Sequence, residues 1–299
     1  MAEAKFTYEI IDKVKKTIRI KQAVSVTEEV IIPEKVVYYK QEYTVTEIGD
    51  RAFFQAFSYF TQLKRVVIPD SVTRIGRWAF KDCHALECVI LPDSIEEIGD
   101  GAFARCPYIE IKGKIPAENS GAIIINGRLI APPRKVVEYE VPKSVTSIGD
   151  WAFAGCENLT AITIPEGVTN IGESAFNNCT SLTSITIPES VTSIGEGAFF
   201  NCYNLTSITI PEGVTSIGIH AFCNCSSLTA ITISEGVTSI GYEAFCSCNS
   251  LTAIIIPEGV TSIGERAFHD CSSLASIIIP KNKETIIKLL PERLQALVK

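Results

Sequence analysis

Apolar residues recur at fixed positions through most of the chain. In residues 159–178 they follow the order Leu-x-x-Ile-x-Ile-Pro, then a Val, an Ile and an Ala-Phe pair, with a Cys next. Side chains alternate faces along a strand, so Ile162 and Ile164 are expected to point one way and Thr163 the other. The pattern repeats every 23 residues, as in the copy that begins at Leu182. A fixed period of this length predicts a stack of similar coils.

No single unit can bury its own apolar side chains. Only the next coil along the chain can cover Ile171 and Phe176, so each position is expected to form a ladder through the stack. Coils should lie about 4.8 Å apart, which is the spacing of neighbouring strands. Pro165 is expected to end the strand because it lacks an N–H group, and Gly172 to permit a sharp bend. The Ala175-Phe176 pair is predicted to lie in one short helical turn.

Both ends of the chain depart from the repeat, as expected for terminal coils, because one face of each meets water. Residues 1–49 carry two alternating segments around a polar turn, which predicts a capping hairpin followed by a degenerate first coil. Residues 281–299 change to a helical period, which predicts a helical cap. The repeats between them, residues 50–280, are expected to form one solenoid.

Two insertions interrupt the repeat. The first adds residues after position 50 and gathers several aromatic side chains. The second, at about residues 113–135, lacks the Ala-Phe and Cys positions and has Asn126-Gly127 between two apolar runs, which predicts a β-hairpin. Because the regular coils are nearly identical, specificity is expected to lie in these insertions. The residues singled out there are Phe54, Tyr59, Asn126 and Arg128.

The unit LTSITIPEGVTSIGEGAFFNC resembles the BspA-type leucine-rich repeat. The ITIP strand, the TSIG step, the AF pair and the Cys carry the resemblance, which extends over about residues 45–280. The hairpin also resembles inserts of that family. Together with the period, the resemblance implies an α/β, strand-rich repeat fold: a right-handed leucine-rich-repeat solenoid of about ten coils. A parallel strand sheet is expected on one face and short helical turns on the other.

The resemblance also implies a non-enzymatic binding module, often exposed at a cell surface and linked to adhesion. We therefore expect a scaffold that contacts a protein partner, or alternatively a glycan, through its concave strand face and its insertions, as a monomer or weak dimer. The alternative is the isolated repeat domain of a bacterial or protist adhesin that contacts a host or matrix protein or glycan. The N-terminus lacks a signal-peptide pattern, which indicates a cytoplasmic chain, whereas the resemblance suggests the cell surface or secretion. The sequence contains no run of about 18 apolar residues, so no membrane insertion is predicted.

The outward positions of the strands form the expected binding face. In the central coils they are threonines, which suit a flat, exposed sheet. Toward the two ends they are apolar, and an exposed apolar patch often marks a contact surface. For the last two positions the alternative is burial under the C-terminal cap. The column comprises Val67, Ile90, Glu140, Thr163, Thr186, Thr209, Thr232, Ile255 and Ile278.

Eight of the eleven cysteines recur at the position that closes a coil. Regular recurrence predicts packing, since a free Cys behaves as a small buried hydrophobe. Stacked thiols would also lie within disulfide range, but reduced thiols are expected. The eight are Cys83, Cys106, Cys156, Cys179, Cys202, Cys225, Cys248 and Cys271.

Cys223 and Cys246 are extra, each two residues before a ladder cysteine. Three interpretations stay open: free thiols, which we expect; a disulfide between the stacked pair; and a metal site. A zinc site is disfavoured because zinc-binding cysteines usually come as C-x2–4-C, and one Cys of each pair should point inward. We assign no metal and no cofactor.

The three histidines, His84, His220 and His269, lie on different coils near the same turn. His269-Asp270-Cys271 places a base, an acid and a thiol next to one another in sequence. A nucleophile and its base must also meet in space, and Cys271 is expected in the buried, inert ladder. We therefore predict no catalytic residue and no enzyme activity.

Charge is unevenly distributed along the chain, whose formal net charge is −7. Residues 142–280 contain two basic and twelve acidic residues, a net charge of −10, whereas residues 1–141 balance. This composition argues against a nucleic-acid partner, which needs a basic face. One acidic column follows the strands and is interpreted as a solubilising edge, or alternatively as a ridge for a basic partner or Ca²⁺. It comprises Glu166, Glu189, Glu212, Glu235 and Glu258.

Overall fold

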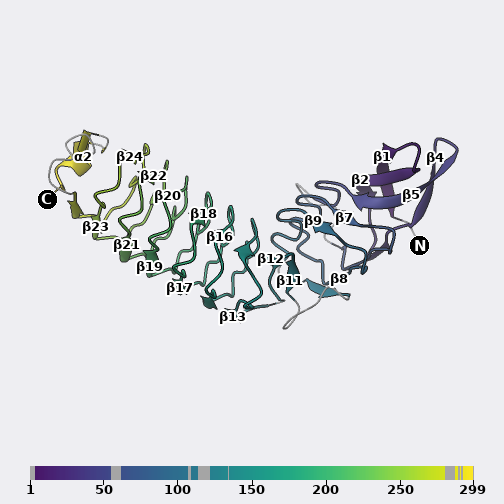
Figure 1. The fold of residues 1–299 in the computed structure, drawn as a ribbon, viewed down its shortest axis with the longest axis horizontal. Helices are drawn as coiled ribbons and strands as arrows, with labels where there is room; N and C mark the ends of the chain where they lie inside the picture. Colours follow the sequence, from purple (N-terminus) through teal and green to yellow (C-terminus); the bar gives the residue numbers. More distant parts are fainter. Residues whose placement is uncertain are drawn as a thin grey trace. The chain divides into compact units, whose positions relative to one another are not determined.

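The computed structural model describes residues 4–54, 62–106, 109–113, 122–133, 135–279, 287–288, 290 and 292–298. The chain forms two compact units, unit 1 (Met1–Lys135) and unit 2 (Val136–Lys299). Each unit is built of successive windings that carry short strands separated by turns (Figure 1). The boundary between the units falls directly after the predicted hairpin insertion.

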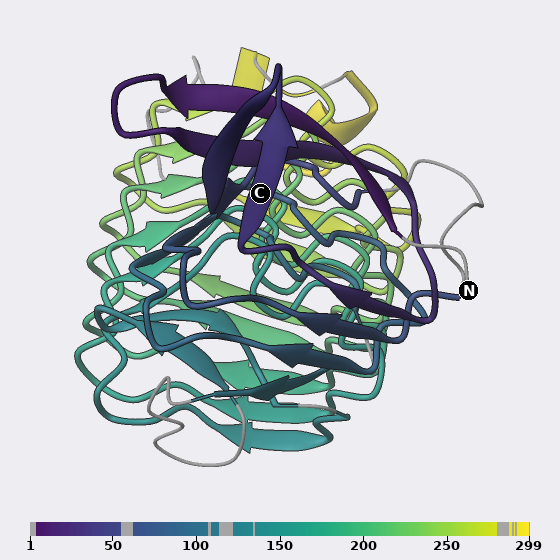
Figure 2. The same ribbon diagram turned by 90° about the vertical axis from the view of Figure 1, so that its right-hand side faces the viewer.

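Unit 1 begins with the predicted capping hairpin, shown in purple in Figure 2. Strands β1 (Lys5–Asp12) and β2 (Thr17–Ser25) pair antiparallel around a tight turn. Strand β2 then pairs in parallel with β5 (Gln41–Ile48), which pairs in parallel with β7 (Arg74–Ile75). The hairpin therefore passes directly into the first coils, as predicted. A second hairpin, formed by β4 (Lys35–Tyr38) on β5, was not predicted.

Strand β9 pairs in parallel with β7, and the remaining strands of unit 1 form a second, parallel sheet and the inserted hairpin. The sheet has the order β10-β8-β6-β3, so β3 lies at one edge. The hairpin joins β11 to β12 antiparallel, and its turn residues Asn126 and Gly127 have φ angles of 51° and 75°, as an Asn-Gly turn requires. The bounds are β3 (Glu29–Ile31), β6 (Arg65–Val67), β8 (Cys88–Ile90), β9 (Glu97–Ile98), β10 (Glu110–Lys112), β11 (Ile123–Ile125) and β12 (Arg128–Ala131).

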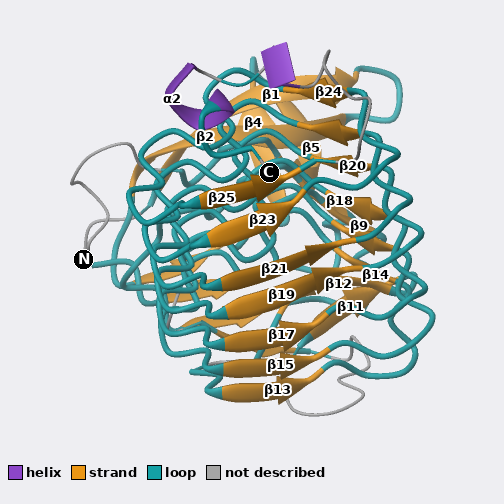
Figure 3. Cartoon of the chain, turned by 90° about the vertical axis from the view of Figure 1, so that its left-hand side faces the viewer, coloured by secondary structure: helices purple, strands orange, loops and turns teal. Residues whose placement is uncertain are grey.

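Each coil of unit 2 carries one longer and one two-residue strand, stacked on those of its neighbours (Figure 3). The register joins equivalent residues, as in Ile162 on Ile185 and Thr163 on Thr186. The longer strands are β13 (Glu138–Glu140), β15 (Ala161–Thr163), β17 (Ser184–Thr186), β19 (Ser207–Ile210), β21 (Ala230–Ile233), β23 (Ala253–Ile255) and β25 (Ser276–Ile278). The shorter strands are β14 (Ser147–Ile148), β16 (Asn170–Ile171), β18 (Ser193–Ile194), β20 (Ser216–Ile217), β22 (Ser239–Ile240) and β24 (Ser262–Ile263).

The third side of each coil is a turn and not the short helix that we predicted. Ser174 and Asn178 have positive φ angles of 51° and 59°. Their N–H groups donate to carbonyl groups of the next coil, at Glu196 and Phe200, with N···O distances of 2.8 and 2.9 Å. A helical turn would keep such bonds within one coil, whereas left-handed residues direct them to the neighbour. The α part of the predicted α/β fold class is therefore wrong, and the fold is a strand-rich β-solenoid of about 11 turns.

A file of phenylalanine rings runs through the core of each unit. In unit 2, Phe176, Phe199 and Phe222 stack with ring centroids 5.2 and 5.3 Å apart and planes within 6° of parallel. All three side chains are fully buried, and each contributes roughly 1.5–3 kcal/mol. The predicted ladder of stacked residues is thus confirmed. The file of unit 1 comprises Phe53, Phe80 and Phe103.

Buried cysteines follow the same 23-residue spacing beside the rings. The thiol of Cys202 donates to the carbonyl of Phe176 at 3.2 Å, and the thiol of Cys225 to that of Phe199 at 3.3 Å. Burial raises the pKa of Cys202 to about 12, so this thiol stays protonated at neutral pH. None of the eleven cysteines, all of which the structure describes, forms a disulfide bond.

The helical cap predicted for residues 281–299 is not supported. In the described part of this segment, α2 (Glu292–Gln295) spans four residues. The chain then continues to Val298, which forms a parallel bridge with Ile277 of β25, and the Ile277 N–H donates to the Leu297 carbonyl at 2.9 Å. The buried side chains of the segment include Leu290 and Leu294. The last strand, β25, therefore pairs at Ile277 with extended backbone near the C-terminus and not with a helix.

Candidate binding surfaces

The outward column of unit 1 is apolar and longer than the sequence indicated. Val67 and Ile90 occupy equivalent positions on β6 and β8 and are half-buried. Strand β3 adds Ile31, which pairs with Val67 and is 68% exposed. The sequence analysis did not single out Ile31, which lies in the predicted degenerate first coil. Unit 1 thus presents three apolar side chains in register, with the most exposed one on the edge strand.

The outward column of unit 2 is exposed along its length. Glu140 and the four threonines Thr163, Thr186, Thr209 and Thr232 all face solvent. Ile255 and Ile278 are 61% and 42% exposed. The alternative that the C-terminal segment covers these two isoleucines is therefore wrong for the described residues. The flat polar ladder and its apolar end have the exposure that we predicted.

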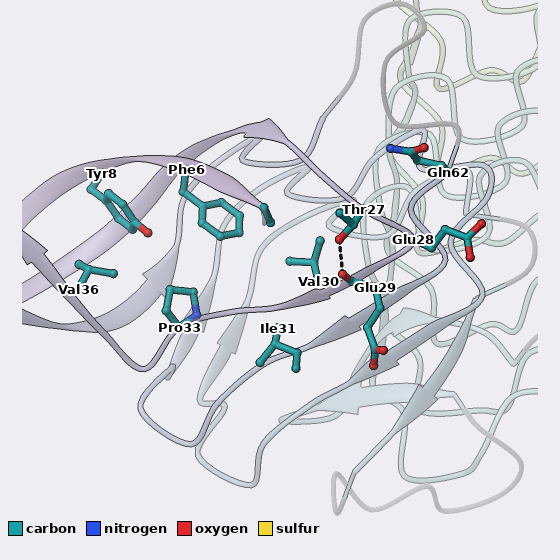
Figure 4. A pocket seen from close by; sticks show the side chains of 11 residues that line it. Phe6, Tyr8, Thr27, Glu28, Glu29, Val30, Ile31, Pro33, Val36 and Gln62 are labelled. Atoms are coloured by element: carbon teal, nitrogen blue, oxygen red, sulfur yellow. Dashed lines mark hydrogen bonds between the residues drawn. The ribbon is translucent and has the colours of Figure 1, made fainter. Parts of the chain in front are cut away.

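A pocket of about 980 Å³ opens beside β3 in unit 1. Figure 4 shows Phe6 and Tyr8 of β1 and Val36 of β4 on one side, and Ile31 of β3 close to them. The lining combines aromatic and aliphatic side chains, as small ligand and peptide pockets do. The sequence did not reveal this pocket, because the hairpins that form its wall lie outside the regular repeat.

Two carboxylates form the polar rim of this pocket, and both are already paired. Glu28 lies 3.2 Å from the ammonium of Lys64, and Glu29 lies 2.9 Å from Nε of Arg65. The hydroxyl of Thr27 donates to the carbonyl oxygen of Glu29. These exposed pairs contribute little to stability, but they balance the charge at the rim. The pocket therefore suits an apolar group more than a cation.

The backbone of β3 leaves one side of the strand directed away from its sheet. In the parallel register, the carbonyl of Glu28 accepts from Arg65, and the N–H of Ile32 donates to Val67. Alternate residues of a parallel strand bond to opposite neighbours. The N–H and C=O groups of Ile31 therefore point to the outer edge, next to the pocket.

The aromatic insertion is described only up to Phe54, and the predicted Tyr59 lies outside the described residues. Phe54 is half-buried and lies against Arg51 and Lys81, at 6.0 and 5.8 Å from its ring centroid. The same two cations lie closer to the Trp78 ring, with Arg51 at 4.5 Å and Lys81 at 4.9 Å from its centroid. Burial lowers the pKa of Lys81. Phe54 thus belongs to a cation–aromatic cluster inside unit 1.

The hairpin residues have different environments. Asn126 is exposed at the turn, as predicted for a contact residue. Arg128 is half-buried and forms an ion pair with Asp100 of the neighbouring coil. This ion pair joins the hairpin to the coil that carries Asp100, so Arg128 has a structural role within unit 1.

A group of sulfur, imidazole and carboxylate side chains lies on the turn side of unit 2. Donor atoms of His220, Cys223 and Glu243 all lie within 4.8 Å of one another. Burial, followed by the adjacent Cys246 thiol, raises the pKa of Cys223 to about 12. A hydrogen bond from Tyr242 is the main cause that lowers the pKa of Glu243. The sequence analysis named these cysteines and histidines separately but did not bring them together.

The sequence neighbours His269, Asp270 and Cys271 do not form a catalytic arrangement with one another. Nδ1 of His269 lies 3.1 Å from Asp270, but the Cys271 thiol donates to the buried carbonyl of Phe245 at 3.1 Å. The thiol near the imidazole is that of Cys246, 4.0 Å away. Cys271 follows the buried ladder, as predicted.

The acidic column of unit 2 is exposed and is joined to the backbone. The N–H of Glu258 donates to the carboxylate of Glu235 at 3.0 Å, and that of Glu212 to Glu189 at 3.4 Å. Each carboxylate thus caps the turn of the following coil. This arrangement favours the structural interpretation of the column over a ligand-binding one.

Six copies of the BspA type leucine rich repeat region match the chain, over residues 35–118, 133–238 and 194–289. These ranges cover more than half of the sequence. The chain belongs to the BspA-type leucine-rich repeat family. Leucine-rich repeat proteins of this type are typically protein-binding or surface repeat proteins.

Solved structures of bacterial leucine-rich repeat proteins are similar to this chain. A leucine-rich repeat protein from Eubacterium ventriosum has 21% identity and a TM-score of 0.53, with 86% of this chain and 91% of that chain covered. The pneumococcal vaccine antigen PcpA has 18% identity and a TM-score of 0.55, with coverage of 95% and 81%. A leucine rich cell surface protein from Faecalibacterium prausnitzii has 27% identity and a TM-score of 0.43, with coverage of 95% and 96%. The first two similarities support the fold.

A search among curated proteins gave no match. Among the described residues, no helix combines the length and the apolar character needed to cross a membrane.

Proposed function

We propose that the chain is a non-enzymatic protein-binding module, and that it binds an extended segment of its partner at the outer edge of β3. The observation that carries the proposal is the position of Ile31. Its side chain is 68% exposed, its strand ends the sheet, and a pocket of about 980 Å³ adjoins it. An exposed strand edge is a template for another strand, and a pocket beside it gives side-chain specificity.

The other predicted contact residues support this choice by comparison. Phe54 and Arg128 already make interactions within unit 1. The threonine column of unit 2 is uniform, so a partner segment could bind it in several registers with nearly the same contacts. Val67 and Ile90 continue the apolar face from Ile31 and extend the proposed contact onto the sheet. The partner segment is therefore expected to be extended and apolar, with a large side chain in the pocket.

The test selects peptides from a random library displayed on phage, with the full chain immobilised, and measures their dissociation constants by titration calorimetry. The variant Ile31→Pro removes the outward N–H, and Ile31→Asp places a charge beside the pocket. Each is expected to weaken binding at least about tenfold, because the hydrogen bond or the apolar contact is lost. The matched control is Ile255→Asp, an exposed isoleucine at the equivalent position of unit 2.

The proposal fails if no library peptide is retained above background. It also fails if selected peptides bind both Ile31 variants as tightly as the unaltered chain, or if Ile255→Asp alone weakens them. Far-ultraviolet circular dichroism of each variant shows whether it retains the strand content of the parent. An unchanged spectrum with lost binding assigns the loss to the edge of β3.

A further inference from the structure

Two columns of positions on the turn side of unit 2 vary from coil to coil. The first column, two residues after the Ile-Gly step, is Ser174, Gly197, His220, Glu243 and Arg266. The second column, three residues further along, is Asn177, Phe200, Cys223, Cys246 and His269. The residues with metal-binding side chains are thus concentrated in three consecutive coils.

Coil stacking brings four of these side chains into one group, which we call the thiol–imidazole cluster. Within a coil, a turn joins the two columns: the N–H of Cys223 donates to the carbonyl of His220, and that of Cys246 to Glu243, both at 3.1 Å. Between coils, the N–H of His220 donates to Tyr242 at 2.9 Å. The cluster consists of His220, Cys223, Glu243 and Cys246.

The donor atoms of His220, Cys223 and Glu243 converge, and the Cys246 thiol adjoins that of Cys223. Nδ1 of His220 lies 3.3 Å from one carboxylate oxygen of Glu243, and the Cys223 sulfur is within 4.8 Å of both groups. The other carboxylate oxygen lies 3.5 Å from Arg266, which orients it. Two neighbouring rings hold the imidazole edge-on, with centroids 6.1 Å (Phe200) and 5.5 Å (Tyr242) away.

One ring nitrogen in this group makes no hydrogen bond. Nδ1 of His220 is shielded from solvent and has no hydrogen-bond partner among the described residues, although it faces Glu243. A buried polar atom normally finds a partner. The side chains themselves retain access to solvent, since His220 is 36% and Glu243 is 18% exposed. The imidazole nitrogen and the carboxylate therefore face each other, 3.3 Å apart, at a place that an ion can reach from solvent.

We propose that the thiol–imidazole cluster binds one divalent transition-metal ion, with Zn²⁺ as the natural occupant. Thiolate and imidazole ligands favour Zn²⁺ over Mg²⁺ or Ca²⁺, which prefer oxygen. The spacings His-x2-Cys and Glu-x2-Cys match the short loops of zinc ligands. Ligands of a tetrahedral zinc ion lie roughly 3–4 Å apart, so side-chain rotation of about 1 Å completes the site.

This site differs from the four-cysteine arrangement that the sequence suggested. Cys225 and Cys248 point into the buried ladder, as expected, and donate to backbone carbonyls. The remaining ligands come from the first column, one coil apart. The bound ion would join two consecutive coils and so stabilise unit 2 by mass action.

The test uses the full chain, reduced with a phosphine and stripped of metal by chelation, with its free thiols counted by mass spectrometry. Titration with Co²⁺ is followed by absorbance, and bound Zn²⁺ is measured by elemental analysis. We expect one ion per chain, an intense visible d–d band of tetrahedral cobalt and a thiolate-to-cobalt charge-transfer band. We also expect Zn²⁺ to raise the unfolding temperature.

Variants are chosen from residues that other coils carry at the same positions, so that the fold is retained. His220→Ser copies Ser174, and Cys223→Ala copies Ala154. Each is expected to weaken Co²⁺ binding at least about tenfold, the effect of losing a contributor to a metal site. The matched cysteine control is Cys88→Ala in unit 1, which should bind Co²⁺ like the parent.

Several outcomes would overturn the proposal. They are the absence of both cobalt bands in the reduced chain, octahedral cobalt without sulfur coordination, and unchanged cobalt spectra in Cys223→Ala. A Cys223–Cys246 disulfide that persists in the reduced preparation would also exclude the site, because it removes both thiolate ligands.

Discussion

At the scale of single residues, the glycine of several Ile-Gly steps is required by the neighbouring coil. A Cβ atom at Gly195 would lie 2.4 Å from the backbone nitrogen of Glu173 and 2.5 Å from the carbonyl carbon of Gly172. These are backbone atoms, which cannot move as a flexible side chain can. Gly172 and Gly195 are not among the glycines with positive φ. The cause is therefore lack of space, and not the backbone freedom that we expected at Gly172.

This cause predicts different costs at two equivalent glycines. At Gly218 the nearest backbone atoms to a Cβ are 3.2 Å away, so the neighbour needs to move by only a few tenths of an ångström. Gly195→Ala is expected to lower the free energy of unfolding by about 1–3 kcal/mol, the cost of overpacking, and Gly218→Ala by clearly less. Urea unfolding measures both variants. If both variants lose the same free energy of unfolding, the steric contact with the neighbouring coil does not determine the cost of the substitution.

At the scale of elements, two of the hairpins of unit 1, β11–β12 and β4–β5, differ in their turn residues. The inserted hairpin uses Asn126-Gly127, which the sequence signals, and its position was predicted correctly. The β4–β5 hairpin turns at Tyr39 and Lys40, whose φ angles are 48° and 61°. Neither residue type favours a left-handed conformation, so neither one indicates a turn at this position. Pairing of β5 with β2 and β4 stabilises the turn although its two residues disfavour a left-handed conformation.

Exchange of the turn residues tests this account. Lys40→Gly removes the steric cost of a left-handed lysine and is expected to raise the free energy of unfolding by up to about 1 kcal/mol. Gly127→Lys introduces that cost in the other hairpin and is expected to lower it by about 1–2 kcal/mol. Chemical unfolding of the two variants and the parent gives both values. A loss of stability in Lys40→Gly would mean that the lysine side chain makes a contribution larger than the strain.

At the scale of the whole molecule, what could be predicted depends on how far each feature follows the period. The phenylalanine file and the Ile162-on-Ile185 register follow it fully and were predicted. The turns with left-handed Ser174 and Asn178 were not, because the Ala-Phe segment has the composition of a helical turn and only inter-coil bonding decides otherwise. The pocket near Ile31 depends on non-repeating hairpins. The thiol–imidazole cluster could have been found by aligning residues 23 apart, which places His220 on Glu243 and Cys223 on Cys246.

Removal of one whole coil tests the stacking principle in unit 2. Deletion of residues 183–205 joins Leu182 to Thr206 and keeps every later residue in phase, so Phe176 would stack on Phe222. The shortened chain is expected to fold and to lose only the free energy of one repeat and its interface, on the order of a few kcal/mol. Deletion of residues 184–205, one residue fewer, moves each strand side chain to the opposite face and is expected to unfold the coils beyond the junction. Far-ultraviolet circular dichroism and urea unfolding distinguish the two. Similar stability in both would mean that adjacent coils accept any register, and the side-chain ladders would then not determine the fold.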